Sequence, residues 1–204
     1  MRYLSTQGAY ATNLIEVIGR GLAPDGRLYV PERLPSFNFQ EIQGESLAEI
    51  AIELLEPFFQ GSSLEEELEE ICKDAFNFPV PLEELNKGKL SVLELFHGPT
   101  AAFKDVGARF LASVMERSLE ELGLKDKRPL TILVATSGDT GGAVAAAFHG
   151  RSGMRVIVLF PDGQVSPRQK HQLTCWTGNI SSYEVNGSFD QCQALLKSAF
   201  TDSV

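Results

Sequence analysis

Apolar residues recur three and four positions apart in the first part of the chain, which predicts short helices there. One helix is expected over residues 12–22, where glycines end it, and a second over 46–59, which opens with the S-x-x-E spacing of a capping box. A third is expected to begin at Ser63 and to bury the apolar positions Leu64, Leu68, Ile71 and Phe76. Residues 1–80 are therefore predicted to form a small, mostly helical N-terminal domain.

From residue 81 to the C-terminus, short apolar runs alternate with helical patterns. The runs at 130–135 and 154–160 are continuous, which is typical of strands buried on both faces, and a third strand is expected at 180–185. Three strand–helix units with short connections predict a parallel sheet with helices on both faces and right-handed crossovers. Residues 81–204 are therefore predicted to be an α/β domain.

A lysine lies where one of these apolar runs gives way to a helix. The run at 92–96 is followed by the breaker triplet 97–99, and a helical pattern is established by Phe110, so Lys104 is expected after a strand and in a first helical turn. The positive end of a helix dipole disfavours a cation, and burial adds to that effect. These conditions keep a lysine amine partly neutral and nucleophilic, as Schiff-base chemistry requires. The alternative is a surface lysine paired with Asp105.

The loop after the strand at 130–135 has the composition of an anion site. Residues 135–141 (A-T-S-G-D-T-G) combine hydroxyls, glycines and backbone N–H groups with the start of a helix, so the loop could bind a carboxylate or a phosphate. Ligands collect at the carboxyl ends of parallel strands. The alternative is an ordinary strand-to-helix turn in which Asp139 caps the helix. The loop has neither the Gly-Lys-Ser/Thr of a Walker A motif nor dinucleotide spacing.

Two segments together closely resemble the signatures of the threonine synthases, which are pyridoxal-phosphate enzymes of the tryptophan-synthase β-subunit fold type. They are 93–109 (L-E-L-F-H-G-P-T-A-A-F-K-D-V-G-A-R) and 136–142 (T-S-G-D-T-G-G), and the resemblance extends over essentially the whole chain. It implies a fold-type-II domain, here incomplete, and pyridoxal 5'-phosphate as the cofactor. The cofactor-binding residues that it implies are Lys104, which carries the cofactor covalently, Phe103, Asp105 and Asp139.

The resemblance also implies the roles of individual residues. Phe103 would pack under the pyridine ring, and Asp139 would face the phenolic oxygen of the cofactor. His97 would help to position the lysine, although a histidine that opens a tight turn is also an ordinary structural residue. The basic pair Arg168 and Lys170 would steer a phosphorylated substrate, with a solvated helix face as the alternative for Lys170. The substrate-binding residues that the resemblance implies are Thr136, Ser137, Gly138, Thr140, Ser166 and Gln169.

The implied activity is that of a carbon–oxygen lyase, which converts O-phospho-L-homoserine and water to L-threonine and phosphate. The alternatives are a threonine or serine dehydratase and a shortened, non-catalytic binding or regulatory module. The family's later loop for the cofactor phosphate, and its hydroxyl residue near the pyridine nitrogen, have no counterpart before Val204. We therefore interpret the chain as an N-terminal portion, which alone is expected to be inactive.

Charge and cysteine content limit the classes of partner and ligand that are expected. The chain has 18 Lys and Arg against 27 Asp and Glu, a net charge of −9, and no basic block, which argues against nucleic acid or anionic membrane as partners. The three cysteines have no metal-type spacing and are each predicted to be small buried hydrophobes. The glutamate run at 65–70 is interpreted as a solvated face, with a metal or partner role as the alternative. A cytoplasmic location is expected, since the N-terminus lacks the apolar core of a signal peptide. We also expect that the protein binds no metal and is a monomer or a homodimer.

Overall fold

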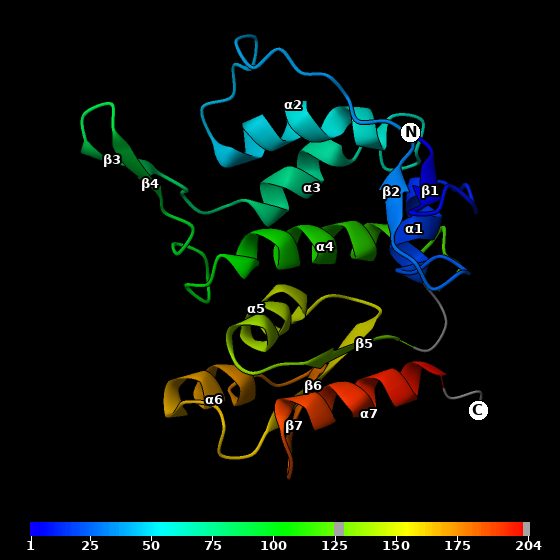
Figure 1. Ribbon diagram of the computed structural model, residues 1–204, viewed down its shortest axis with the longest axis vertical. Coiled ribbons are helices and arrows are strands. Elements are labelled where there is room, and N and C mark those ends of the chain that lie inside the picture. Colours follow the sequence, from blue (N-terminus) through cyan, green and yellow to red (C-terminus); the bar gives the residue numbers. More distant parts are fainter. Residues whose placement is uncertain (125–128, 202–204) are drawn as a thin grey trace.

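A computed structural model describes residues 1–124 and 129–201 of the chain, in stacked layers (Figure 1). The layer formed first along the chain holds a small antiparallel sheet and three helices. Strands β1 and β2 pair with Tyr3 opposite Pro31. The elements of this part are β1 (Tyr3–Ser5), α1 (Leu14–Arg20), β2 (Tyr29–Pro31), α2 (Leu47–Phe59) and α3 (Leu68–Ala75).

The predicted capping box at the start of α2 is confirmed. Ser46 is the N-cap, its hydroxyl accepts from the backbone N–H of Glu49 at 3.2 Å, and the Glu49 carboxylate accepts from the Ser46 N–H at 2.9 Å. The predicted start of the third helix is wrong, because α3 begins at Leu68 and not at Ser63. Residues 61–67 form successive tight turns in which the Glu65 side chain accepts from the N–H of Gly61. The apolar positions Leu64, Leu68 and Ile71 are nevertheless buried.

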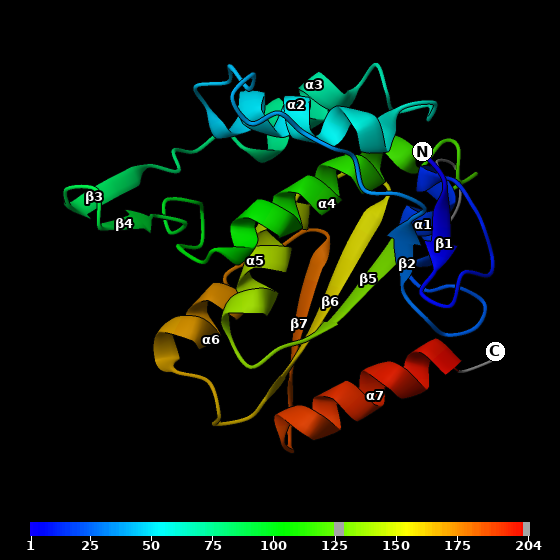
Figure 2. The same cartoon turned by 45° about the horizontal axis from the view of Figure 1, so that its top comes forward.

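The second part of the chain contains the predicted parallel sheet, in the order β5-β6-β7. Helices α5 and α6 pack on one face and α7 on the other, which confirms helices on both faces (Figure 2). Helix α4 lies between α5 and the N-terminal helices. The elements are α4 (Lys104–Ser118), β5 (Leu130–Ala135), α5 (Asp139–Phe148), β6 (Met154–Pro161), α6 (Pro167–Thr174), β7 (Ile180–Val185) and α7 (Phe189–Thr201).

Two expectations about strands are wrong. Strand β5 is half-buried along its length and not fully buried, because within the described residues it pairs with β6 alone and forms an edge of the sheet. The apolar run before Lys104 does not join the parallel sheet. It contributes β4 (Leu90–Leu93), which pairs antiparallel with β3 (Leu82–Asn86) in an exposed hairpin that projects from the body (Figure 1). Residues 94–103 then lead to α4 as a loop without a strand.

Helix α4 contributes side chains to both hydrophobic cores. The sheet core holds Val156, Val158 and Phe160 together with Met115 of α4, and the N-terminal core holds other residues together with Val114 of α4. Both Val114 and Met115 are at most 9% exposed. Because neighbouring residues of one helix are buried in two cores, α4 is a middle layer packed on both sides.

The cysteine prediction holds for two of the three residues. Cys72 and Cys192 are buried, and burial raises the pKa of Cys72 to about 11, so its thiol stays protonated and unreactive. Cys175 is exposed at the end of α6, so the prediction that it is buried is wrong. None of the described helices is both long and apolar enough to cross a bilayer.

Candidate functional site

A pocket of about 470 Å³ lies where the starts of α4 and α5 approach each other. Most of its α4 wall is one helix face, because Lys104, Gly107, Ala108 and Leu111 follow each other at spacings of three, one and three residues. The α5 wall includes Thr140, from the second signature of the sequence. The two signatures therefore line one pocket. The lining residues are Leu95, Phe103, Lys104, Val106, Gly107, Ala108, Leu111, Thr140 and Val144.

Lys104 is the first residue of α4 and is half-buried in this pocket. Its Nζ lies 4.5 Å from the centre of the Phe103 ring, within the range of a cation–π contact. The preceding residues give the helix no side-chain cap, and the N–H groups of Asp105 and Val106 donate instead to the carbonyls of Ala102 and Phe103, at 3.0 and 3.3 Å. The prediction of a lysine in the first turn of a helix is confirmed, whereas the strand before it, β4, ends at Leu93 and belongs to the antiparallel hairpin.

Asp105 does not line the pocket but folds back on the loop before α4. Its carboxylate is completely buried and accepts from the Thr100 N–H at 2.9 Å and the Thr100 hydroxyl at 2.7 Å. A Cβ at Gly98 would lie 2.8 Å from the Asp105 Cβ, so the turn needs glycine there. The alternative of a surface ion pair between Lys104 and Asp105 is therefore wrong, because burial and Thr100 define the surroundings of this carboxylate. A direct contact of Asp105 with a cofactor stays a prediction.

The loop before α5 is organised by a buried hydroxyl. Thr136 is 2% exposed, and its Oγ1 accepts from the N–H of Gly138 at 3.0 Å and of Gly141 at 2.9 Å. Gly138 is the N-cap, with φ of 150° and ψ of −105°, so the alternative in which Asp139 caps the helix is wrong. Ser137 and Thr140 are exposed on the outer side of the turn. The Thr136 hydroxyl thus shapes the loop, while Ser137 and Thr140 remain accessible to a ligand.

Helix α6 holds the loop before α5 from the side. Ser166 and Gln169 form a capping box, and the Gln169 Nε2 also donates to the Asp139 carboxylate at 3.1 Å. A Cβ on Gly138 would lie 2.4 Å from that Nε2, which explains the glycine. One turn further along α6, Gln172 donates to the Thr100 carbonyl at 3.4 Å. No motif marks Gln172 in the sequence, although its side chain reaches the loop before α4.

The weaker candidates lie outside the pocket lining. The Nε2 of His97 is 2.6 Å from the Glu94 carboxylate, three residues before it. Lys170 donates to the Glu184 carboxylate of β7 at 2.6 Å, and this hydrogen bond lowers the pKa of Glu184. Both contacts are exposed on the protein surface. Among the described residues no group of three or more metal-type side chains was found, and the absence of a metal stays a prediction.

Two family models and several threonine synthases match this chain. The family described as "Pyridoxal-phosphate dependent enzyme" matches residues 76–203, and the one described as "Threonine synthase N terminus" matches residues 2–76. The threonine synthase of Haemophilus influenzae is 40% identical over 188 residues, which are 92% of this chain and 43% of that protein. The threonine synthase of Schizosaccharomyces pombe is 41% identical over 215 residues, or 98% of this chain and 42% of that protein.

Solved structures of threonine synthases are also similar to this chain. The crystal structure of PLP-bound threonine synthase from Brucella melitensis superposes with a TM-score of 0.88 at 39% identity, over 100% of this chain and 45% of that one. Threonine synthase from yeast superposes with a TM-score of 0.88 at 31% identity, over 99% of this chain and 44% of that one. The chain spans less than half the length of these relatives.

Proposed function

Because the chain belongs to the family of pyridoxal-phosphate dependent enzymes, we propose that Lys104 binds this cofactor covalently and that the protein is a threonine synthase. The reaction is the conversion of O-phospho-L-homoserine and water to L-threonine and phosphate. The observation that carries the proposal is the pocket in which Lys104 and Thr140, one from each signature, line the same space. The identity of about 40% to threonine synthases over most of the chain supports this choice among pyridoxal-phosphate enzymes.

The residues present fit the cofactor. A pocket of about 470 Å³ is of the size that small ligands and cofactors occupy. Its walls combine an amine at one helix start with apolar side chains that can contact an aromatic ring, including Phe103 and Leu111. Lys104 would hold the aldehyde, Phe103 would contact the ring, and Asp139, fixed by Gln169, would face the phenolic oxygen.

The chain's own groups then have distinct tasks. When bound, pyridoxal phosphate supplies an electron sink for charge that develops on the substrate. The Lys104 amine would take and return a proton at the substrate's α-carbon. Ser137, Gly138 and Thr140 hold the substrate carboxylate at the start of α5, where backbone N–H groups and the helix dipole favour an anion. Ser166 and Gln169 complete this side of the site, with Thr136 fixing the loop from within.

The proposal extends to the length of the active protein, its domains, its location, its oligomeric state and its substrate. The activity is assigned to a protein of the length of the relatives, and the 204 residues alone are expected to bind the cofactor weakly and to turn over little, since they match 42–44% of the curated threonine synthases. We propose that residues 1–80 form one domain and that residues 81–204 form the first part of a catalytic domain. The protein is placed in the cytoplasm, as a monomer or homodimer, with a phosphorylated amino acid as its small-molecule substrate.

The test uses the protein as its cell makes it, tagged at the N-terminus in its own gene and purified with added cofactor. Phosphate and threonine released from O-phospho-L-homoserine are measured in parallel, with Lys104→Ala as the matched inactive variant. Equal amounts of both products from the unmodified protein, and none from the variant, support the proposal. Release of ammonia from threonine or serine without phosphate release from phosphohomoserine would assign a dehydratase instead. Neither activity, with the cofactor bound, would assign the binding module.

A further inference from the structure

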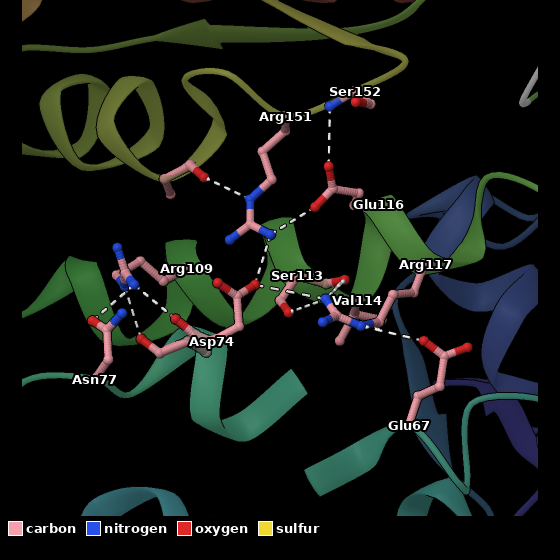
Figure 3. Close-up of polar contacts among 12 residues, drawn as sticks. Glu67, Asp74, Asn77, Arg109, Ser113, Val114, Glu116, Arg117, Arg151 and Ser152 are labelled. Atoms are coloured by element: carbon pink, nitrogen blue, oxygen red, sulfur yellow. Dashed lines mark hydrogen bonds and ion pairs between the residues drawn. The ribbon is translucent and has the colours of Figure 1, made fainter. Parts of the chain in front are cut away.

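Arginine side chains converge on the carboxyl-terminal end of α3 (Figure 3). Arg109 of α4 donates from Nε to the Ala75 carbonyl at 2.8 Å and from Nη2 to the Asp74 carbonyl at 2.7 Å. Arg151, which follows α5, donates to the Asp74 carboxylate at 2.6 Å, and Arg117 of α4 lies 3.6 Å from the same carboxylate. The last carbonyls of a helix lack partners within it and carry partial negative charge, so these cations stabilise the end of α3.

The electrostatics of Asp74 agree with this geometry. Burial raises the pKa of its carboxyl, but hydrogen bonds from Arg151 and Ser113 outweigh burial, and the pKa is lowered. Asp74 therefore stays ionised between the arginines at neutral pH. The contacts join α3 to both α4 and the α5–β6 connection, where Arg151 also donates to Glu116 at 2.7 Å. The N-terminal helices are thus bound to the part of the chain that carries the pocket.

Helix α4 presents a different face to each side. The residues Lys104, Gly107, Ala108 and Leu111 line the pocket, whereas Arg109 and Phe110 face the end of α3. The Phe110 ring stacks on that of Phe76, with centres 5.8 Å apart and planes 3° from parallel. Arg109 follows Lys104 by five residues, which corresponds to about 7.5 Å along a helix axis. The contact between helices is therefore close to the lysine but on another side of the helix.

We propose that Arg109 is a positioning residue for Lys104. By binding the two backbone carbonyls at the end of α3 in a fork-like geometry, its guanidinium fixes the rotation of α4 about its axis. That rotation decides where the amine of Lys104 enters the pocket. The inference rests on the proposed function of Lys104, and it gives the N-terminal helices a part in orienting the amine although they contribute no residue to the pocket lining.

Arg117 provides the matched comparison. It also lies on α4, and besides its contact with Asp74 of α3 its Nε is 3.3 Å from the carboxylate of Glu67, the residue before α3. However, it follows Lys104 by thirteen residues, or about 20 Å along a helix axis. Loss of Arg117 removes a contact between the same helices at a distance from the amine. A role in general stability is thus shared by both arginines, whereas the positioning role belongs to Arg109 alone.

The experiment compares Arg109→Met, Arg109→Lys and Arg117→Met in the N-terminally tagged protein. The readouts are the melting temperature, the rate at which pyridoxal phosphate forms an adduct at Lys104, and the circular dichroism of the bound cofactor per mole. Arg109→Met is expected to slow adduct formation by about tenfold and to weaken the cofactor band, because small displacements of a reacting group have large effects on rate. Arg109→Lys should recover part of both. Arg117→Met should lower the melting temperature and leave rate and band unchanged.

Hydrogen exchange separates failure of this inference from failure of the proposed function. If pyridoxal phosphate forms no adduct at Lys104 of the unmodified protein, the function proposed for Lys104 fails. Hydrogen exchange at the amides of α4 still reports whether Arg109 fixes the helix. Amides of residues 108–112 should exchange faster in Arg109→Met than in Arg117→Met. Equal exchange there, or rates of adduct formation that fall alike in both variants, would overturn the positioning role. If Arg109→Met does not fold, a rate in Arg109→Lys equal to that of the unmodified protein would overturn it as well.

Discussion

The loops before α4 and before α5 lead into the two helix starts that line the pocket, but they are built differently. The loop at 98–103 is held by the buried carboxylate of Asp105, which lies after it in the chain and binds Thr100. The loop at 136–138 is held by the buried hydroxyl of Thr136, which is its own first residue. A charged group organises one loop and a neutral group the other.

This difference has energetic consequences. A buried carboxylate is desolvated, so its hydrogen bonds to Thr100 are charge-assisted and their loss is costly. A neutral hydroxyl is cheaper to bury, and the second loop depends also on the backbone conformation of Gly138 and on Gln169 of α6, which packs beside it. The first loop should therefore fail when its charge is removed, and the second when its stereochemistry is changed.

Asp105→Ala is expected to have the largest effect. It leaves the Thr100 N–H without its acceptor in a buried site and should lower the free energy of unfolding by about 3 kcal/mol. Urea unfolding measures the loss. Asp105→Asn, which keeps one acceptor oxygen, is the control and should lose less. A loss below about 1 kcal/mol in Asp105→Ala would show that the carboxylate does not organise the loop.

Gly138→Ala tests the stereochemistry of the second loop. With φ of 150° and ψ of −105° the backbone there is accessible essentially to glycine, and a Cβ would meet Gln169 at 2.4 Å. A loss of about 2 kcal/mol is expected from backbone strain and crowding. Gly107→Ala is the matched control. It lies within α4 with open space around its Cβ, so it should gain about 0.5–1 kcal/mol.

Thr136→Val removes the hydroxyl while keeping the shape of the side chain. Two buried N–H groups, of Gly138 and Gly141, lose their acceptor, and a loss of about 1–2 kcal/mol is expected. Thr136→Ser keeps the hydroxyl and should restore most of the stability. The measurement is again urea unfolding. Equal losses in both variants would assign the effect to packing of the methyl group and not to the hydrogen bonds.

Ser166→Ala should have the smallest effect on stability, about 1 kcal/mol from the loss of a helix cap. Ser188→Ala, which removes the hydroxyl that accepts from Gln191 at the start of α7, should cost a similar amount. The two differ at the site, because only Ser166 is bound to the Gln169 that contacts Asp139. Binding of a substrate carboxylate should weaken in Ser166→Ala and remain unchanged in Ser188→Ala, as isothermal titration can measure.

Local patterns predicted the elements whose ends depend on neighbours in the sequence. The capping box expected at Ser46 marks the start of α2, and the strand expected at 180–185 is β7. Such features depend on contacts over three or four residues, so the sequence contains all their partners. The position of Lys104 in a first helical turn was predictable for the same reason.

Features that depend on distant partners were not predictable. The apolar run before Lys104 gives no indication that β4 pairs with β3 outside the parallel sheet. The half-buried state of β5 depends on which strands lie beside it and not on its own residues. Likewise, Asp105 beside Lys104 suggested an ion pair, whereas the fold directs its carboxylate to Thr100. The contact of Gln172 with that loop has no local signal at all.

The most direct test of the central claim is a peptide map of the protein after incubation with pyridoxal phosphate and reduction with borohydride. The account predicts that the label lies on Lys104, that Lys104→Ala abolishes it and that Lys170→Ala, which removes an amine already paired with Glu184, leaves it intact. Equal labelling of Lys104, Lys170 and other lysines would contradict the account, because no amine would then be distinguished by the pocket.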